Sequence, residues 1–152
     1  MKIRKATKID TGFCIEIAKG LPEWFDEKGI KDIAKDLATL PTYVYDDGNV
    51  LGYICVNHKS DKVIEIAQFA VEKDHQRIGV GSALLEYVEN ELSNNRVVEV
   101  KTLDESCDYE PYVLTRAFYS KHGFVKIEVV DPYPGWSPGN PCAIYVKVPQ
   151  NG

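Results

Sequence analysis

The chain has 152 residues, of which 44% are hydrophobic and 27% charged, a composition typical of one soluble globular domain, expected here to span residues 1–152. Its formal net charge of −5 and its pI near 5.2 argue against nucleic acid or an anionic membrane surface as a partner. No apolar run is long enough to cross a bilayer, and the first ten residues lack the apolar core of a signal peptide, so a cytoplasmic location is expected.

Cysteine and histidine are too scattered to suggest a metal centre or a disulfide framework. The four cysteines include no CxxC pair, and the three histidines form no cluster. This pattern favours a reduced chain without a metal site. The cysteines are Cys14, Cys55, Cys107 and Cys142.

The first third of the chain predicts one strand and two helices. Residues 2–5 favour a short strand. A helix is expected to follow, capped by Asp10 or Thr11 and continuing to about residue 19. Three of its apolar residues are expected to be buried: Phe13, Ile17 and Ala18. A second helix is expected over 26–40, because apolar residues recur on one face. That face consists of Ile30, Ile33, Ala34 and Leu37.

A hairpin and a series of strands and helices follow. The strands of the hairpin, at 42–45 and 50–57, flank Asp46-Asp47-Gly48-Asn49, a strong turn signal. The later elements are expected in this order: a central strand at 62–71, a glycine-rich turn and a helix, a strand at 97–102, an acidic loop at 103–111, a helix at 112–122, a strand at 124–130, a loop at 131–141 and a last strand at 143–148. The order predicts a mixed α/β domain with antiparallel hairpins at one end and βαβ connections later.

The segment at 65–88 gives the clearest functional signal, because a strand, a glycine-rich turn and a helix follow one another there. Gly79 and Gly81 let the backbone direct its N–H groups toward one point without an intervening Cβ. The helix that starts in the turn adds the unpaired donors of its first turn and the positive end of its dipole. Such an arrangement binds an anion, most naturally a phosphate or a pyrophosphate.

Two common phosphate-binding motifs fit this turn poorly. The Walker motif requires a lysine at the helix start, and none stands beside Gly79 or Gly81. The dinucleotide motif requires a third glycine, where this chain has Leu84. The residues present at 76–81 read QxxGxG, and a second notable segment at 117–124 reads AFYSKHGF.

These two segments resemble the acetyl-coenzyme-A motif and the FYxKxGF segment of the GNAT superfamily of N-acetyltransferases. The order of elements from Lys2 to Val148 is also similar to that of the family. The resemblance implies a mixed, mostly antiparallel central sheet, flanked by helices and splayed to hold acyl-CoA. It also implies an enzyme that uses acetyl-CoA to acetylate a primary amine of a small molecule or peptide by direct transfer. A catalytically silent acyl-CoA-binding module of the same fold is the alternative.

The resemblance assigns one set of residues to the coenzyme. Backbone N–H groups of the turn would surround the pyrophosphate, and the strand before the turn would pair with the pantetheine arm and supply an N–H for the oxyanion. The set comprises Phe69, Ala70, Val71, Gln76, Arg77, Ile78, Gly79, Val80, Gly81, Ser82, Tyr112 and Lys121. Tyr112 stands where many family members carry an asparagine, so this chain departs from the family pattern there.

Two residues are expected to carry the proton transfers. An alkylammonium, whose pKa is near ~10, must lose a proton before it attacks the thioester. Glu65 is the one acid inside the central strand, where a charge is costly unless it faces a cleft or a partner. The resemblance implies that Glu65 is the general base; a glutamate on a solvated edge or in a structural ion pair is the other interpretation. Tyr119 matches the family's tyrosine that protonates the leaving thiolate, and a core tyrosine with a hydrogen-bonded hydroxyl is the alternative.

The acceptor site is expected to be lined by aromatic residues of the loops, although Trp24 and Phe25 could equally cover the core. Tyr109 and Trp136 complete this expected set. Four acids next to the proposed site would attract a cationic amine, unless they are simply solvated. These acids are Asp104, Glu105, Asp108 and Glu110. The protein is expected to be a monomer or a homodimer.

Overall fold

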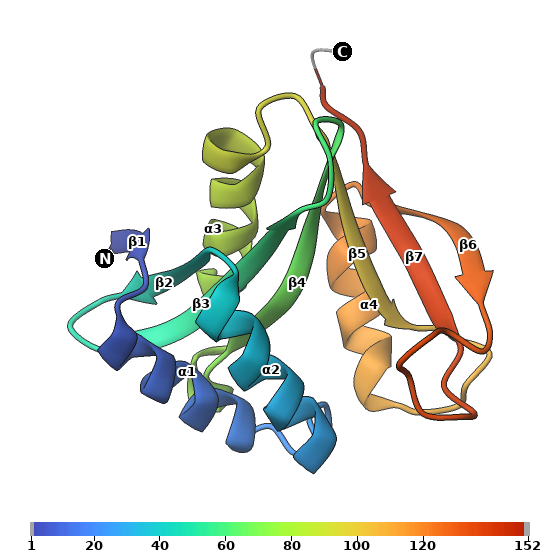
Figure 1. Ribbon diagram of the computed structural model, residues 1–152, viewed down its shortest axis with the longest axis horizontal. Helices are drawn as coiled ribbons and strands as arrows, with labels where there is room; N and C mark the ends of the chain where they lie inside the picture. Colours follow the sequence, from blue (N-terminus) through green and yellow to red (C-terminus); the bar gives the residue numbers. More distant parts are fainter. Residues whose placement is uncertain (1, 151–152) are drawn as a thin grey trace. The chain divides into compact units, whose positions relative to one another are not determined.

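The computed structural model describes residues 2–150, and within them the chain forms seven strands and four α-helices (Figure 1). In order they are β1 (Lys2–Lys5), α1 (Lys8–Lys19), α2 (Glu27–Thr39), β2 (Thr42–Asp46), β3 (Val50–His58), β4 (Val63–Val71), a 3₁₀ segment (Lys73–His75), α3 (Val80–Tyr87), a π-helical segment (Val88–Leu92), β5 (Val97–Leu103), α4 (Pro111–Lys121), β6 (Val125–Val130) and β7 (Cys142–Lys147). In this part of the chain, no helix has the length and apolar character needed to span a membrane.

The strands form one sheet in the order β1-β2-β3-β4-β5-β7-β6. The β1–β2, β2–β3, β5–β7 and β6–β7 pairs are antiparallel. The predicted mixed α/β fold with a mostly antiparallel sheet is therefore confirmed. The strands expected from the sequence are all present, and their bounds differ from the expected ones by no more than about a residue at either end.

The described residues divide between two compact units. The first unit runs up to His58 and includes Ile66–Asn94, and the second comprises Lys59–Glu65 and the described chain from Asn95 onward. Strand β4 contributes its first residues to the second unit and the rest to the first. Each unit is described in turn.

In the first unit, helices cover both faces of β2 and β3. Helix α1 packs against α2 and β3, and α3 contacts β2 and β3 from the other face (Figure 1). The alternation of the strands sorts their side chains, so that Val44 and its partner Tyr53 face α1 and α2, whereas Tyr43 packs against Tyr87 of α3 at 5.3 Å between ring centroids. The buried core on the α1–α2 side consists of Cys14, Ile17, Ala18, Leu21, Ile33, Leu37, Val44, Tyr53, Cys55 and Ala70.

Helix α1 begins earlier than expected, and the prediction of a cap at Asp10 or Thr11 is wrong. Thr7 is the N-cap, and its side-chain oxygen accepts a hydrogen bond from the N–H of Asp10. The carboxylate of Asp10 accepts one in return from the N–H of Thr7 at 2.7 Å. These reciprocal bonds form a capping box, in which the acid belongs three residues inside the helix. Arg4 also donates to this carboxylate, at 2.6 Å.

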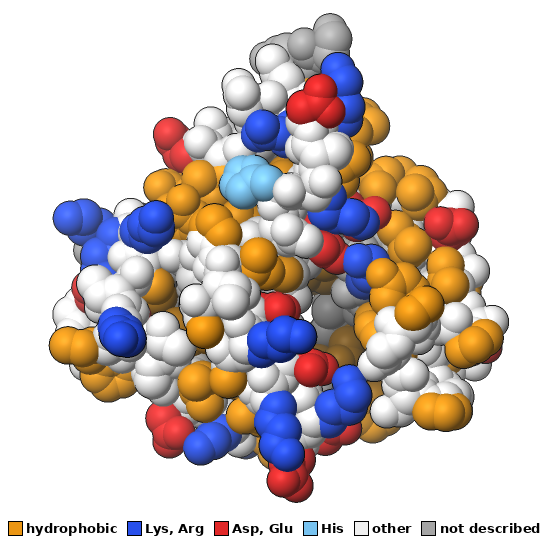
Figure 2. All heavy atoms as spheres, in the orientation of Figure 1, with side chains coloured by type: hydrophobic (Ala, Val, Ile, Leu, Met, Phe, Trp, Pro, Cys, Tyr) orange, Lys and Arg blue, Asp and Glu red, His pale blue; other side chains and the backbone are white. Residues whose placement is uncertain are grey.

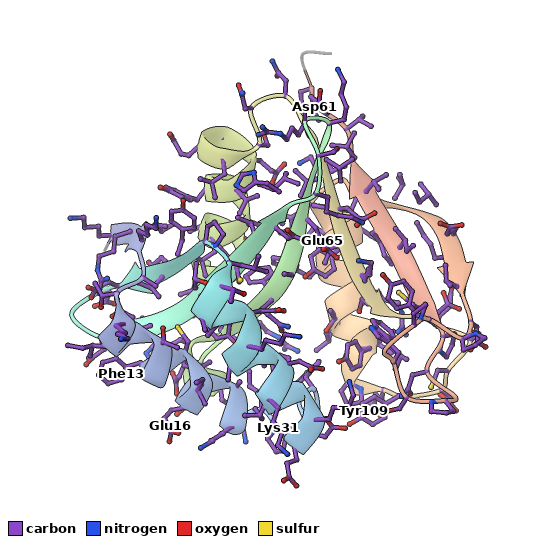
Figure 3. The ribbon with its side chains drawn as sticks, viewed as in Figure 1. Phe13, Glu16, Lys31, Asp61, Glu65 and Tyr109 are labelled. Carbon is purple, nitrogen blue, oxygen red and sulfur yellow. The ribbon has the colours of Figure 1, made fainter. Side chains whose placement is uncertain are left out.

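The predicted burial of Phe13 is wrong as well. Its side chain is 54% exposed and points outward from α1 (Figure 3), whereas Ile17 and Ala18 are buried as expected. Cys14 is fully buried beside them. Successive helical residues are separated by about 100° around the axis, so a stripe that passes through Cys14 turns Phe13 to solvent.

In the second unit, β5, β7 and β6 form an antiparallel sheet, and α4 packs against β5. The guanidinium of Arg116 on α4 donates a hydrogen bond to the carbonyl of Leu103 at 2.8 Å, which fixes the helix to the end of β5. On the face that Figure 2 shows, acidic and basic side chains are interspersed rather than gathered into one basic patch.

Candidate active site

The glycine-rich turn lies between the end of β4 and the start of α3, in the first unit. The side chain of Gln76 donates a hydrogen bond to the carbonyl of Val71 at 3.2 Å, which ties the turn to the end of the strand. Arg77 and Gly79 both have left-handed backbones, with φ of 66° and 95°. Gly79 is the N-cap of α3, and its carbonyl accepts the N–H of Ala83 at 3.0 Å. The turn residues 76–79 are all exposed.

This geometry suits a phosphate. Left-handed residues in a turn bring neighbouring N–H groups onto one concave side, and the first turn of α3 adds donors that have no intrahelical acceptor. A Cβ at Gly79 would meet no atom within 4 Å, so crowding does not explain the glycine. Its left-handed backbone conformation does. The geometry of the turn is compatible with the expected anion site, whose occupancy stays a prediction. The left-handed conformation of Arg77 was not foreseen.

A third glycine, Gly52 of β3, supports this arrangement and was missed in the sequence. A Cβ there would lie 3.1 Å from the side chains of Val80 and Leu84 on α3, and 3.1 Å from the carbonyl oxygen of Ala70 on β4. The missing side chain thus lets the first turn of α3 pack closely on the sheet. A glycine inside a strand pattern is a signal for such an approach.

Glu65 lies on β4 in the second unit (Figure 3), and its carboxylate forms an ion pair with the ammonium of Lys101 on β5. The two side chains are 13% and 16% exposed. The Lys101 nitrogen also lies 5.3 Å from the centroid of the Tyr133 ring. Burial lowers the pKa of Lys101, but its bonds with Glu65 and Tyr133 outweigh burial and raise that pKa above its ordinary value. Glu65 therefore has a cationic partner, and its role as a general base stays a prediction.

Tyr119 is buried near the end of α4, where the helix stops in a Schellman motif. The N–H of Phe124 donates to the carbonyl of Tyr119 at 3.0 Å, and the N–H of Gly123 donates to the carbonyl of Ser120 at 3.1 Å. Gly123 has a φ of 90°, as this motif requires, and the ring of Phe124 packs 5.5 Å from that of Tyr119. The glycine and phenylalanine of the second motif thus form the helix cap that holds Tyr119. Burial raises the pKa of the Tyr119 hydroxyl above its usual value, so the group is protonated at neutral pH.

The other candidates of the first unit are mixed in exposure. Ala70 and Val80 are buried, so only their backbones could meet a coenzyme, whereas the side chain of Ile78 is 66% exposed. Trp24 and Phe25 are partly buried against the α1–α2 core, which matches the alternative that they cover the core.

The remaining candidates of the second unit are mostly aromatic. Tyr109, in the loop before α4 (Figure 3), is 40% exposed and packs 6.0 Å from the ring of Tyr112. Trp136 packs 5.7 Å from the ring of Tyr133, and Lys121 is exposed at the end of α4. Their roles at the site stay predictions.

The acidic loop is partly neutralised by its own contacts. Asp104 is 4% exposed, and its carboxylate accepts hydrogen bonds from the Ser106 N–H at 3.0 Å and from Lys126 at 2.9 Å. Burial opposes the charge, but these bonds outweigh it and lower the pKa of Asp104 to about 2. Lys126 also bonds Glu105, at 3.1 Å. Half of the four predicted acids are therefore engaged with a lysine of β6.

A family model described as Acetyltransferase (GNAT) domain matches residues 38–126, so the chain belongs to the GNAT family of acetyltransferases. No match was found among curated proteins.

Solved structures resemble this fold along almost the whole chain. A GNAT-family protein from Desulfovibrio desulfuricans is 18% identical, with 97% of this chain and 98% of that chain covered and a TM-score of 0.81. The ribosomal-protein-S18-alanine N-acetyltransferase of Escherichia coli is 17% identical, with 97% and 93% covered and a TM-score of 0.74. An aminoglycoside 6'-N-acetyltransferase complexed with coenzyme A is 17% identical, with 97% of each chain covered and a TM-score of 0.71. At these identities the likeness concerns the fold.

Proposed function

We propose that this protein is an acetyl-CoA-dependent N-acetyltransferase that transfers the acetyl group directly to a primary amine of a small molecule or peptide. The observation that carries the proposal is the turn at 76–79, where Arg77 and Gly79 have left-handed backbones immediately before the N-terminus of α3. Such a turn suits the pyrophosphate of coenzyme A, and one structurally similar protein was solved with that coenzyme. The chain's membership of the GNAT family makes coenzyme A the expected ligand.

Two side chains of the second unit are proposed to handle the protons. When bound, acetyl-CoA supplies the thioester carbonyl that the amine attacks. Glu65 would accept the proton of the incoming ammonium, directly or through a water molecule. The protonated hydroxyl of Tyr119 would donate a proton to the sulfur as the carbon–sulfur bond breaks, and the nitrogen would give its second proton back to the Tyr119 oxygen, directly or through a water molecule. A backbone N–H near the end of β4 would stabilise the oxyanion.

The acceptor is proposed to be an amine that aromatic loops can contact. The structurally similar proteins include one named for an aminoglycoside and one named for an alanine of a ribosomal protein, so both a small molecule and a peptide amine are represented. Tyr109 is the most exposed of the aromatic candidates in the second unit, and the paired rings of Tyr133 and Trp136 form a second surface.

A coenzyme-binding module without catalysis is the second candidate, and one observation favours it. The carboxylate of Glu65 is already paired with Lys101, so an incoming amine has to displace that ammonium before it can reach the carboxylate. Activity and binding must therefore be measured separately.

The proposal is tested by following thiol release from acetyl-CoA across a panel of amines. The panel contains an aminoglycoside, a peptide with an N-terminal alanine, a polyamine and free lysine. Turnover with one class of amine, together with calorimetric binding of coenzyme A, is the expected result. Coenzyme binding without turnover on any amine would favour the silent module, and the absence of coenzyme binding would overturn both candidates.

A further inference from the structure

The ammonium of Lys101 lies among groups that together would bind any alkylammonium. Its nitrogen is in ion-pair contact with the carboxylate of Glu65 and lies 5.3 Å from the centroid of the Tyr133 ring. A second carboxylate, that of Glu99, lies 3.8 Å from the same nitrogen. An aromatic face within about 6 Å and a carboxylate in contact are the two elements by which proteins recognise primary and substituted ammonium groups.

Of the two carboxylates near the Lys101 ammonium, Glu65 is its main partner. Glu99 has its own closer partner, because Lys59 contacts it at 2.8 Å, a full ångström nearer than Lys101. The side chains of Glu65 and Lys101 are both less than one fifth exposed, so the pair is largely shielded from solvent. Lys59, by comparison, is 38% exposed.

The aromatic part of the site comes from the loop between β6 and β7. The N–H of Trp136 donates to the carbonyl of Tyr133 at 3.0 Å, and the two rings pack at 5.7 Å between centroids. This turn holds the face of Tyr133 beside Lys101, so the ring is part of a defined loop conformation.

We propose that Glu65 and Tyr133 form a binding site for a primary alkylammonium group, and that the chain's own Lys101 is its resident occupant. A lysine side chain is itself a tethered alkylammonium, so its position reports which chemistry the site accepts. The consequence for catalysis rests on the proposed function: the cationic amine to be acetylated meets Glu65 in this site, and it must displace Lys101 to do so.

When a site is already occupied, the apparent affinity of a competing ligand equals its intrinsic affinity multiplied by the fraction of time that the site is empty. If Lys101 leaves the site about one tenth of the time or less, an external ammonium binds the native protein about tenfold or more weakly than it binds an emptied site. Removing the Lys101 side chain should therefore strengthen ammonium binding. A purely structural ion pair would also leave a space that fits an ammonium, so competition with the acceptor amine decides whether the site receives substrate.

The test uses Lys101→Ala and n-propylammonium, which replaces the three carbons and the nitrogen that this substitution removes. Binding is measured by calorimetry and by the rise in Tm on adding the ligand, with n-propanol as the uncharged control. We expect Lys101→Ala to bind n-propylammonium at least about tenfold more tightly than the native protein, and Glu65→Gln in the same background to abolish the gain. Lys59→Ala is the matched control, because it removes the same charge next to Glu99 without emptying the site.

Equal affinity of the native protein and Lys101→Ala for n-propylammonium would overturn the proposal, as would an equal gain in Lys59→Ala. If Lys101→Ala is too unstable to purify, Lys101→Thr, which has a higher strand propensity, empties the space of Cδ, Cε and Nζ only, and it is titrated with ethylammonium instead.

Kinetics then separate this proposal from the proposed function. If the site receives the acceptor, Lys101→Ala lowers the KM for a cationic amine, n-propylammonium competes with that amine, and the affinity for coenzyme A is unchanged. Turnover with an unchanged KM and no competition would overturn the acceptor role and leave the proposed function intact. Tight n-propylammonium binding without turnover on any amine would support the site and count against the proposed function.

Discussion

The glycine turn of the first unit and the Glu65–Lys101–Tyr133 cluster of the second unit are built in opposite ways. The turn is made of backbone: two left-handed residues, a helix start and a side-chain brace from Gln76. The cluster is made of side chains from β4, β5 and the loop between β6 and β7.

The difference determines which substitutions each region tolerates. A backbone site depends on φ angles and on the absence of a Cβ, so it tolerates a change of most side chains except its glycines. A side-chain site depends on charged and hydroxyl groups. A substitution that removes or replaces a single atom can abolish its chemistry while the packing remains. The two regions should therefore fail in different measurements, one in coenzyme affinity and the other in turnover.

The largest effect is expected from Tyr119→Phe. The phenyl ring keeps the packing against Phe124, but the proton donor for the leaving sulfur is lost. General acid catalysis contributes about 100-fold or more, so steady-state turnover should fall by about that factor while the calorimetric affinity for coenzyme A is unchanged. Tyr145→Phe is the control, since Tyr145 is an equally buried tyrosine of the same unit. Equal turnover of Tyr119→Phe and the native protein would exclude the acid role.

A smaller effect, on coenzyme affinity rather than on turnover, is expected from Gly79→Ala. An alanine at a φ of 95° costs roughly 1–2 kcal/mol, and the backbone would relax away from the anion-binding conformation. Affinity for coenzyme A should fall by about tenfold, which corresponds to about 1.4 kcal/mol. Gly12→Ala is the matched control, because Gly12 lies inside α1, where alanine is favoured and a Cβ would meet no atom within 4 Å. Native coenzyme affinity in Gly79→Ala would show that the left-handed turn is not the anion site.

The same contrast explains what the sequence could predict. The turn is recognisable because its two glycines stand directly before an apolar helix. Tyr119 is singled out by the resemblance of its segment to FYxKxGF, in which Gly123 and Phe124 form the helix cap, and its catalytic role stays a prediction. The role of Lys101 was not predicted. Its partner Glu65 is 36 residues away in the sequence, and its partner Tyr133 lies on a distant loop, so no local sequence pattern links the three residues. The cap of α1 was misplaced for a related reason, because an acid such as Asp10 can act as an N-cap or as the third residue of a capping box, and only the partner Thr7 decides which.

The smallest effect concerns stability and compares one buried carboxylate in each unit. The pKa of Asp10 is lowered to about 2, chiefly by its bonds with Arg4, and that of Asp104 is lowered to about 2 by Ser106 and Lys126 despite burial. The unfolded chain has an aspartate pKa near ~3.9, so each group stabilises the fold fully above about pH 4 and loses that contribution as the pH falls toward 2.

Asp10→Asn and Asp104→Asn should therefore lower the Tm at pH 7 by a few degrees, about 2–4 °C for a loss near 1 kcal/mol, and the gap to the native protein should close as the pH approaches 2. Hydrogen exchange read at the amides of α1 and of β5 assigns each loss to its own unit. Because the Asp10 carboxylate also bonds the backbone of the helix cap, Asp10→Asn should loosen α1 first, whereas Asp104→Asn should act on the loop after β5. A Tm difference that stays constant from pH 7 to pH 2 would mean that the lost stability comes from packing rather than from the charge, and the electrostatic account of both units would be wrong.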